Sequence, residues 1–365
     1  MKLWKLKREF ARFAEQLKGL VAQLWEPWEK RRYERQRSVL VHRWDGCIML
    51  DKKHPRVAVY LLFQPEGLSQ STYVACEYLV RKGFAPMVVS NAPINRADRE
   101  RLKALTWQVV QRPNYGYDFG GYREGILQLA ELDCHPDELI LVNDSIWFPF
   151  PAFCDPIDAV RSEKAGLVGL LSAEDKRSRI VLGIARPPFI CSFFLFFRRE
   201  AIDNPAFARF WSNYRYSNSK YKTIRRGERG LTYALSSAGV ECRSVMNRAR
   251  FDCWLETLDL PEIEKVLSFL VTHSDSIKIQ LKSLNARPIH DAEWLKDARA
   301  LLLMGTDGQN YPSLLPYLLL KSVGCGYFKK SLDPINAEAI RIVLAQADIQ
   351  ESIFKQELSQ RVCGG

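Results

Sequence analysis

Strand-like and helix-like segments alternate along the chain from residue 56 onward. Apolar runs typical of buried strands occupy residues 56–63, 84–91, 106–112 and 137–144. Amphipathic runs with helical spacing separate them, at residues 71–83, 97–105 and 120–132. This alternation favours a parallel sheet with helices on both faces, because helical crossovers bury strands that are apolar on both sides. We therefore predict an α/β fold with a mostly parallel sheet, whose ligands bind beyond the carboxyl ends of the strands.

The second half of the chain extends this pattern and then loses it. Further strand-like runs occupy residues 165–172, 179–185 and 191–199, and helix-like runs occupy residues 206–214 and 228–239. Beyond residue 254 the sequence is helical and shows few strand signals. These shifts predict three parts: an N-terminal helix (1–46), an α/β ligand-binding domain (47–254) and a C-terminal helical region (255–365).

The composition is that of a folded protein with reduced thiols. Apolar residues make up 47% of the 365 residues and charged residues 26%, which argues against wholesale disorder. No apolar run reaches the roughly 18 residues of a transmembrane helix, and the opening MKLWKLKREF lacks the apolar centre of a secretory signal. The nine cysteines form no Cys-x-x-Cys pair and the five histidines no His-Glu-x-x-His pattern. A cytosolic protein without a disulfide framework or zinc site is therefore expected.

The first 46 residues carry a basic, amphipathic helical pattern. They hold twelve Lys and Arg against six acids, in a chain whose formal net charge is +11. Apolar residues every three or four positions form one stripe: Leu3, Leu6, Phe10, Phe13, Leu17, Leu20, Leu24 and Trp28. Such a helix suits an anionic membrane surface, and it equally suits packing within the molecule or against a second copy. Nucleic-acid binding is the weaker interpretation, because no nucleic-acid-binding module accompanies the charge.

A polar cluster ends the fourth predicted strand. LILVNDS places Asn143, Asp144 and Ser145 at its carboxyl end, where an α/β sheet presents groups to a ligand. A carboxylate flanked by short polar side chains can hold a divalent cation that bridges a diphosphate. The same three residues are also typical of an Asx turn that simply stops a strand.

A second cluster, RPNYGYDFGGYREG (112–125), follows the third strand and opens a helix. Glycines let a backbone approach a ligand, and a helix N-terminus favours an anion such as phosphate. The candidate ligand-binding residues here are Asn114, Gly116, Asp118, Gly120, Gly121 and Arg123. The alternative is a glycine-rich turn whose aromatic residues pack in the core. No dinucleotide or Walker fingerprint is present.

Glu228 is the third candidate. It begins the helix-like run of residues 228–239. Acids are common at helix starts because they interact favourably with the helix dipole, so a structural role competes with a catalytic one.

Taken together, these stretches resemble the rhamnan synthesis protein F family. The resemblance lies in NYGYDFGGY, LILVNDS, SFFLFFRREA, the helix with Phe-x-x-Phe-Trp, ERGLTYALSSAG, and the late stretch YLLLKSVGCGYFKKSLDPIN (317–336). It covers residues 56–335 approximately and leaves the basic N-terminal helix outside. These are bacterial glycosyltransferases of cell-surface polysaccharide assembly.

The resemblance implies a GT-A-like domain that binds a nucleotide sugar. It implies that Asp144 binds a metal ion, Mg²⁺ or Mn²⁺, and the donor diphosphate, with Asn143 and Ser145 in support. The sequence has one acid where the usual motif is Asp-x-Asp, so a metal-free site is also compatible with it. In related inverting enzymes an acid in the position of Glu228 is the catalytic base. Tyr115, Tyr117 and Trp147 offer flat faces to a base or sugar, or else pack in the core.

The expected function is transfer of a sugar, rhamnose or another deoxysugar, from a nucleotide-diphosphate donor to a lipid-linked cell-surface glycan. The enzyme would act as a peripheral protein on the cytoplasmic, inner face of the plasma membrane, held there through residues 1–34. No nucleic-acid partner is expected. The alternative is a non-catalytic glycan-binding or scaffold protein of the same pathway. The sugar, the linkage, the acceptor and the oligomeric state are not set by the sequence.

Overall fold

The computed structural model describes residues 25–150, 155–173, 188–272, 274–307, 315, 326–330, 334–345 and 353–363. Its central sheet has nine strands. They are β1 (His42–Asp45), β2 (Arg56–Leu62), β3 (Ala85–Ser90), β4 (Gln108–Gln111), β5 (Glu138–Asn143), β7 (Leu167–Ala173), β8 (Phe189–Ile190), β9 (Phe194–Arg198) and β10 (Cys242–Met246). A separate ribbon pairs β6 (Ile146–Trp147) with β11 (Phe328–Lys329).

Helices connect the strands and continue beyond them. In the α/β part they are α2 (Gln70–Arg81), α3 (Arg96–Leu105), α4 (Tyr117–Glu131), α5 (Pro156–Ser162), α6 (Arg199–Ile202), α7 (Pro205–Asn213), α8 (Lys220–Thr223), the π-helix η2 (Ile224–Arg229) and α9 (Gly230–Ser237). Towards the C-terminus they are α10 (Arg248–Thr257), α11 (Leu260–Ser268), α12 (Asp275–Asn285), α13 (Ala292–Thr306), α16 (Pro334–Leu344) and α17 (Ile353–Cys363).

The strand order is β1-β4-β3-β2-β5-β9-β7-β10, with β8 paired to β7. Strands β4, β3, β2 and β5 are parallel, which confirms the mostly parallel sheet. β9 runs antiparallel to both β5 and β7, and β1 runs antiparallel to β4. The chain builds outward from β2 through β3 to β4 and then returns to add β5 on the other side. The strand order therefore reverses between β2 and β5, and a ligand crevice is expected at their carboxyl ends.

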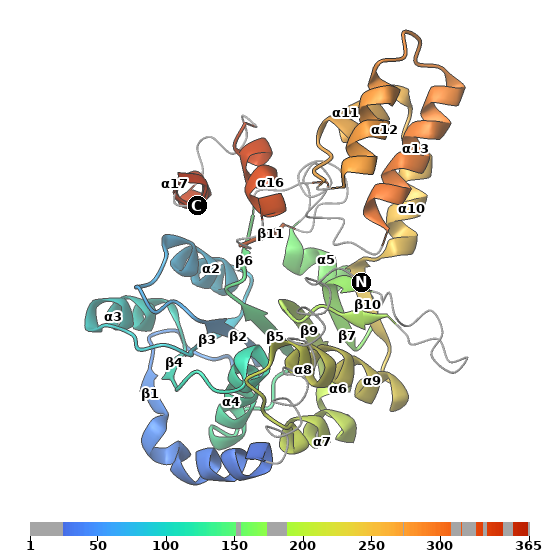
Figure 1. Cartoon of the computed structure of the whole chain (residues 1–365). Coiled ribbons are helices and arrows are strands. Elements are labelled where there is room, and N and C mark those ends of the chain that lie inside the picture. The colour runs from blue at the N-terminus through green and yellow to red at the C-terminus, as the bar shows by residue number, and fades with distance from the viewer. Residues whose placement is uncertain are drawn as a thin grey trace, which may run out of the picture.

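Alternation along the strands divides the core into two layers. In β2, Ala58, Tyr60 and Leu62 belong to one layer, and Val57, Val59 and Leu61 belong to the other. Helices α2, α3 and α5 cover the first face, and α4, α7 and α9 cover the second (Figure 1). Burial on both faces explains why these strands read as continuous apolar runs.

Local signals in the sequence set several helix ends. Gly83 follows α2 with φ +82°, the left-handed conformation that glycine adopts at helix C-termini. Asn95 caps α3, because its side chain accepts a hydrogen bond from the backbone N–H of Asp98 at 2.8 Å. Some predicted bounds moved: for example, α4 begins at Tyr117, and the strand of residues 42–45 lies within the part expected to be helix.

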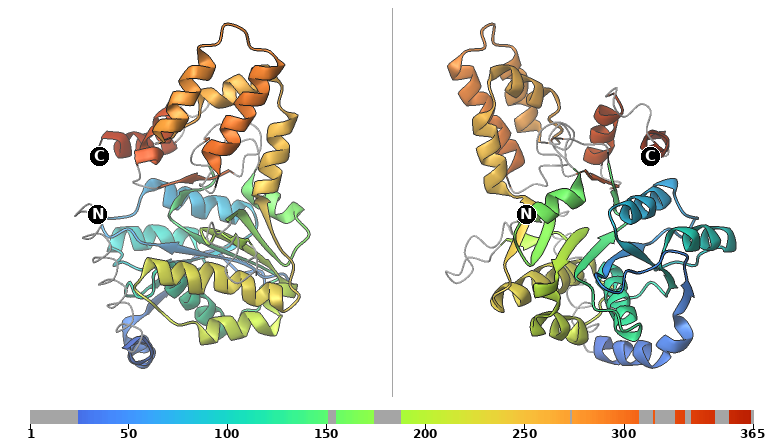
Figure 2. Two further views of the ribbon diagram at one scale, coloured as in Figure 1. Left: turned by 45° about the vertical axis from the view of Figure 1, so that its right-hand side comes forward. Right: turned by 180° about the vertical axis from the view of Figure 1, so that it is seen from behind.

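Further helices precede and follow the sheet. Residues 25–40 form a helix beside α4, and α10 to α13 stand away from the sheet (Figures 1 and 2). Residues 1–24, which carry most of the predicted amphipathic stripe, and the predicted strand 179–185 lie outside the described residues. Among the described helices, none combines the length and apolar character needed to span a bilayer.

Candidate active site

Asp144 lies where the strand order reverses. It follows β5 directly, and its Oδ2 accepts hydrogen bonds from the backbone N–H of Phe63 at 2.8 Å and from Gln64 Nε2 at 3.0 Å, both just beyond β2. Within the described part of the chain, no donor contacts its Oδ1. One carboxylate oxygen is thus oriented by the protein, and the other is available to a ligand in the expected crevice.

Asp118 joins this group from the start of α4. Gly116 and Tyr117 precede it with φ of +85° and +51°, so the chain turns sharply before the helix begins. Asn143 Nδ2 donates to Asp118 Oδ2 at 3.1 Å, and Asn143 Oδ1 accepts from the N–H and Oγ of Ser145 at 3.1 and 2.5 Å. The two polar clusters of the sequence therefore meet, because one asparagine side chain bridges them.

Glu228 reaches the same end of the sheet through Ser192, which lies just before β9. Its Oε1 accepts from Ser192 N–H at 3.0 Å and Ser192 Oγ at 2.6 Å. It was expected to open a helix, and this was wrong: the helical run begins at Lys220, and Glu228 lies within the π-helix. Stabilisation of a helix start by an acid therefore does not explain this residue. π-Helical turns are frequent at functional sites.

The charges of the three acids act on one another. Burial, followed by the neighbouring charges of Asp144 and Glu228, raises the pKa of Asp118 to about 6, against the opposing effect of Lys329 and Lys220. The same three carboxylates, after burial, raise the pKa of the buried Tyr122 hydroxyl. That hydroxyl donates to the Ser192 carbonyl at 2.8 Å. Asp144 and Glu228 thus lie within electrostatic reach of Asp118 and Tyr122, although no group of three His, Cys, Asp or Glu among the described residues is placed to hold a metal ion.

The comparisons with known proteins match the part of the chain that carries these three acids. Residues 87–266 match the model of the rhamnan synthesis protein F family. The resemblance that the sequence motifs indicated is confirmed over this stretch, which contains Asp118, Asp144 and Glu228. The chain is also 29% identical over 272 residues to a Sinorhizobium fredii protein described as "Uncharacterized protein y4gN", covering 73% of this chain and 68% of that one. The family's description connects the matched segment with polysaccharide synthesis.

The glycines of the 112–125 cluster serve packing inside the fold. A Cβ at Gly120 would lie 2.1 Å from the Tyr115 carbonyl oxygen, and one at Gly121 would lie 2.2 Å from the Leu61 side chain. Gly116 donates its N–H to Asn218 Oδ1 at 3.1 Å. These positions bring α4 close to β2 and so place Asp118, while Asn114 is exposed beside them.

The hydrogen-bond partners of Arg123 do not include Asp118, Asp144 or Glu228. Its guanidinium donates to the Trp211 carbonyl at 2.7 Å, to the Tyr216 hydroxyl at 2.5 Å and to Glu34 Oε1 at 2.9 Å. These acceptors belong to the α7 region and the N-terminal helix. In this structure Arg123 therefore connects elements on the second face of the sheet, whereas Asn143, Ser145 and Asp118 lie together beyond the carboxyl end of β5.

The three aromatic candidates have different surroundings. Trp147 is fully buried, with its Nε1 2.8 Å from Glu357 Oε2. Tyr115 packs against Tyr33 and Tyr216, at centroid distances of 5.3 and 4.9 Å. Tyr117 is 41% exposed next to Asp118, so it is the one that presents a ring to solvent beside the acids.

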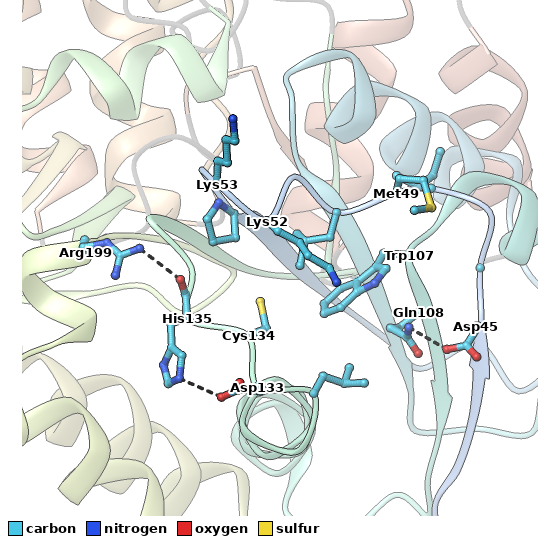
Figure 3. Close-up of a pocket in the computed structure, with 15 residues that line it drawn as sticks. Asp45, Met49, Lys52, Lys53, Trp107, Gln108, Asp133, Cys134, His135 and Arg199 are labelled. Atoms are coloured by element: carbon cyan, nitrogen blue, oxygen red, sulfur yellow. Dashed lines mark hydrogen bonds and ion pairs between the residues drawn. The ribbon is translucent and has the colours of Figure 1, made fainter.

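A pocket of about 680 Å³ opens at the other end of the sheet. Figure 3 shows Trp107, Gln108, His135 and Arg199 around it, close to the amino ends of β4 and β5. Its polar groups already bind one another: Arg199 donates to the His135 carbonyl at 3.2 Å, and Gln108 Nε2 donates to Asp45 Oδ1 at 3.0 Å. The acid cluster at the carboxyl ends is therefore the better candidate for chemistry.

Sequence reasoning missed two partners of the acids. Ser192 orients Glu228, and it immediately precedes the Phe-Phe of the strand motif. Lys329 belongs to the late stretch that carried part of the family resemblance, yet no local pattern connects it with residues nearly 200 positions earlier. Its place at the site follows only from pairing of β11 with β6.

Proposed function

We propose that the protein is a glycosyltransferase that moves a sugar, rhamnose or another deoxysugar, from a nucleotide-diphosphate donor to a lipid-linked cell-surface glycan. The observation that carries the proposal is the convergence of Asp118, Asp144 and Glu228 where the strand order reverses. The carboxyl ends of the strands at such a reversal are the usual nucleotide-binding place of open α/β sheets. The match to a family named for rhamnan synthesis supports a polysaccharide product.

The reaction needs a base for the acceptor, and Glu228 suits this role. The acceptor oxygen forms a bond to the anomeric carbon while the bond from that carbon to the diphosphate oxygen breaks. The electron pair of the broken bond goes to the diphosphate, and the acceptor proton goes to a carboxylate. Ser192 holds Oε1 of Glu228 with two donors, which fixes the direction of the group. A single displacement of this kind inverts the anomeric centre.

Asp144 suits a role on the donor side. Its Oδ2 is held by Phe63 and Gln64. Its Oδ1 has no partner among the described residues and so can meet a sugar hydroxyl or a cation. Mg²⁺ or Mn²⁺, if it is the cofactor, would be held by Asp144 and would supply positive charge at the diphosphate. Asn143 and Ser145 support the turn that presents Asp144.

The proposed place of action is the inner face of the plasma membrane. The basic, amphipathic pattern of residues 1–34 supports attraction to anionic lipid, and a lipid-linked acceptor requires an active site near the bilayer. Residues 25–34 pack on the body of the protein in part, since Glu34 bonds Arg123 and Tyr33 bonds Arg112. Membrane contact is therefore assigned to the preceding residues and to Trp25 and Trp28, which are 59% and 55% exposed.

A thermal-shift screen across nucleotide sugars, with and without Mg²⁺ or Mn²⁺, tests the proposal. A ligand that binds only the native state raises the melting temperature. The donor found in this way is then used with Glu228→Gln, whose amide oxygen can still accept from Ser192. We expect retained donor binding and a loss of transfer of roughly 10²- to 10⁴-fold.

Two results would contradict the proposal. A wild-type protein that neither binds nor hydrolyses any sugar nucleotide would exclude a transferase. Full transfer or donor hydrolysis by both Glu228→Gln and Asp144→Ala would remove the assigned chemistry. Glycan binding without donor binding would instead favour the non-catalytic scaffold.

A further inference from the structure

The C-terminal part of the chain returns to the candidate active site. β11 pairs antiparallel with β6, with Lys329 opposite Ile146 and Phe328 opposite Trp147. The N–H of Lys330 donates to the Ser145 carbonyl at 2.8 Å, and that of Phe150 donates to the Gly326 carbonyl at 2.6 Å. Since β6 directly follows the Asn143–Ser145 turn, this pairing attaches residues 326–330 to the turn that carries Asp144.

The pairing brings the Lys329 ammonium among the acids. Its Nζ lies 3.4 Å from Ser145 Oγ and 3.8 Å from the centroid of the Phe193 ring, within the range of a cation–π contact. Burial has the largest effect and lowers its pKa overall, while the nearby Cys191, Glu228 and Asp118 act to raise it. The amine therefore lies within electrostatic reach of two of the three carboxylates.

The charge balance of the site indicates what this amine is for. A nucleotide diphosphate is itself anionic, and three carboxylates repel it at short range. More negative charge gathers on the diphosphate as the bond to the sugar breaks, and a fixed cation close to that oxygen lowers the barrier. Lys329 lies beside Ser145. Ser145 belongs to the turn that carries Asp144, the carboxylate assigned to the donor.

We propose that Lys329 binds the diphosphate of the sugar donor and stabilises the charge that develops on it as the leaving group. The C-terminal segment 326–330 then completes an active site whose acids come from the first two thirds of the chain. This inference rests on the proposed glycosyltransferase function. It adds a catalytic cation that acts whether or not a metal ion also joins the site.

Binding measurements with the full chain test the assignment. The probes are dTDP, UDP and GDP, each compared with its own nucleoside, first in EDTA and then in Mg²⁺. In Lys329→Gln we expect the diphosphate that the wild type prefers to bind about 10- to 100-fold more weakly in EDTA, the effect of losing one hydrogen bond to a charged group. The nucleoside, which lacks the diphosphate, should bind unchanged.

Matched variants separate this role from a structural one. Lys330→Gln is the control, because the Lys330 ammonium lies 2.9 Å from Ser71 Oγ and its loss should leave diphosphate affinity within about threefold of wild type. Lys329→Arg keeps the charge and should retain most of the affinity. Lys329→Met keeps the stem over Phe193 and replaces Lys329→Gln in the measurement if that variant does not fold.

The outcomes distinguish this inference from the proposed function. If the wild type binds no diphosphate or sugar nucleotide, the glycosyltransferase proposal fails before any variant is measured. If the wild type binds and the neutral Lys329 variant binds the diphosphate equally well in both EDTA and Mg²⁺, Lys329 is not the cation and the transferase stands. An equal loss for diphosphate and nucleoside also overturns the assignment, because it shows a structural effect.

Discussion

Asp118 is held in a position that opposes its own ionisation. It is half-buried at the start of α4, close to the negative charges of Asp144 and Glu228. Asn143 Nδ2 donates to it, yet the net effect is a pKa of about 6, above the ordinary 3.8. A carboxyl group of this kind is about half protonated near pH 6, where an ordinary aspartate is almost fully ionised.

The free energy of unfolding should depend on pH because of the raised pKa of Asp118. Because the pKa is higher in the folded state, its contribution to stability is fully present below about pH 4 and is lost as the pH rises through about 6. Relative to Asp118→Asn, the wild type should therefore lose roughly 2–3 kcal/mol of unfolding free energy between pH 4 and pH 7. Urea unfolding of both proteins at several pH values measures this. A difference that does not change with pH would contradict the assigned pKa.

The π-helix is the element that sets the position of Glu228. It packs on α4 through Gly227, where a Cβ would lie 2.3 to 2.6 Å from three atoms of the Phe119 ring. Phe119 is fully buried and stacks on Trp211 at a centroid distance of 5.8 Å, so it has little room to move. This close approach lets the residue after Gly227 reach Ser192.

Substitution of two nearby glycines should separate packing from helix propensity. Gly227→Ala should destabilise the protein by roughly 1–3 kcal/mol, because the added methyl overpacks Phe119. Gly230→Ala is the control: it has helical φ of −63°, and its nearest neighbour would be 3.5 Å away, so a gain of up to about 1 kcal/mol is expected. Denaturant unfolding compares them. Equal changes in unfolding free energy for the two substitutions would show that the Phe119 ring can move to accommodate the added methyl.

At the scale of the whole molecule, the N-terminal helix is joined to the body by buried ion pairs. Glu26 is 5% exposed and accepts from Lys222 Nζ at 2.9 Å and Arg226 Nη1 at 2.7 Å, next to the π-helix. Arg37 reaches Glu124 of α4, at 2.6 Å from Nη2 to Oε1. For residues 25–40, the intramolecular packing that the sequence left open is therefore present.

Replacing Arg37 alone should lower the free energy of unfolding more than replacing both Arg37 and Glu124. The Glu124 side chain is 1% exposed, so Arg37→Met leaves a buried carboxylate without its cation. We expect a loss of about 3 kcal/mol of unfolding free energy, most of it recovered in Arg37→Met/Glu124→Met. The double-mutant cycle by urea unfolding measures the coupling. Simple additivity of the two substitutions would show that the helix docks by other contacts.

Much of the fold could be predicted from local patterns. The spacing of apolar residues located β2 to β5 and α2 to α4, because the burial of a strand or a helix face sets that spacing within a short stretch of the sequence. The prediction that Asp144 directly follows the carboxyl end of a parallel strand is confirmed, because β5 ends at Asn143. The antiparallel direction of β9 was not predictable, since an apolar strand reads alike in either direction.

The sequence by itself thus determined the α/β class and the candidate acids, since both follow from residues that are neighbours along the chain. Only the tertiary structure decided which partners those acids have. It directed Arg123 towards Glu34, placed Glu228 inside a π-helix against Ser192, and brought Lys329 to Ser145. Contacts between such distant residues depend on how whole elements pack, and no local period encodes that.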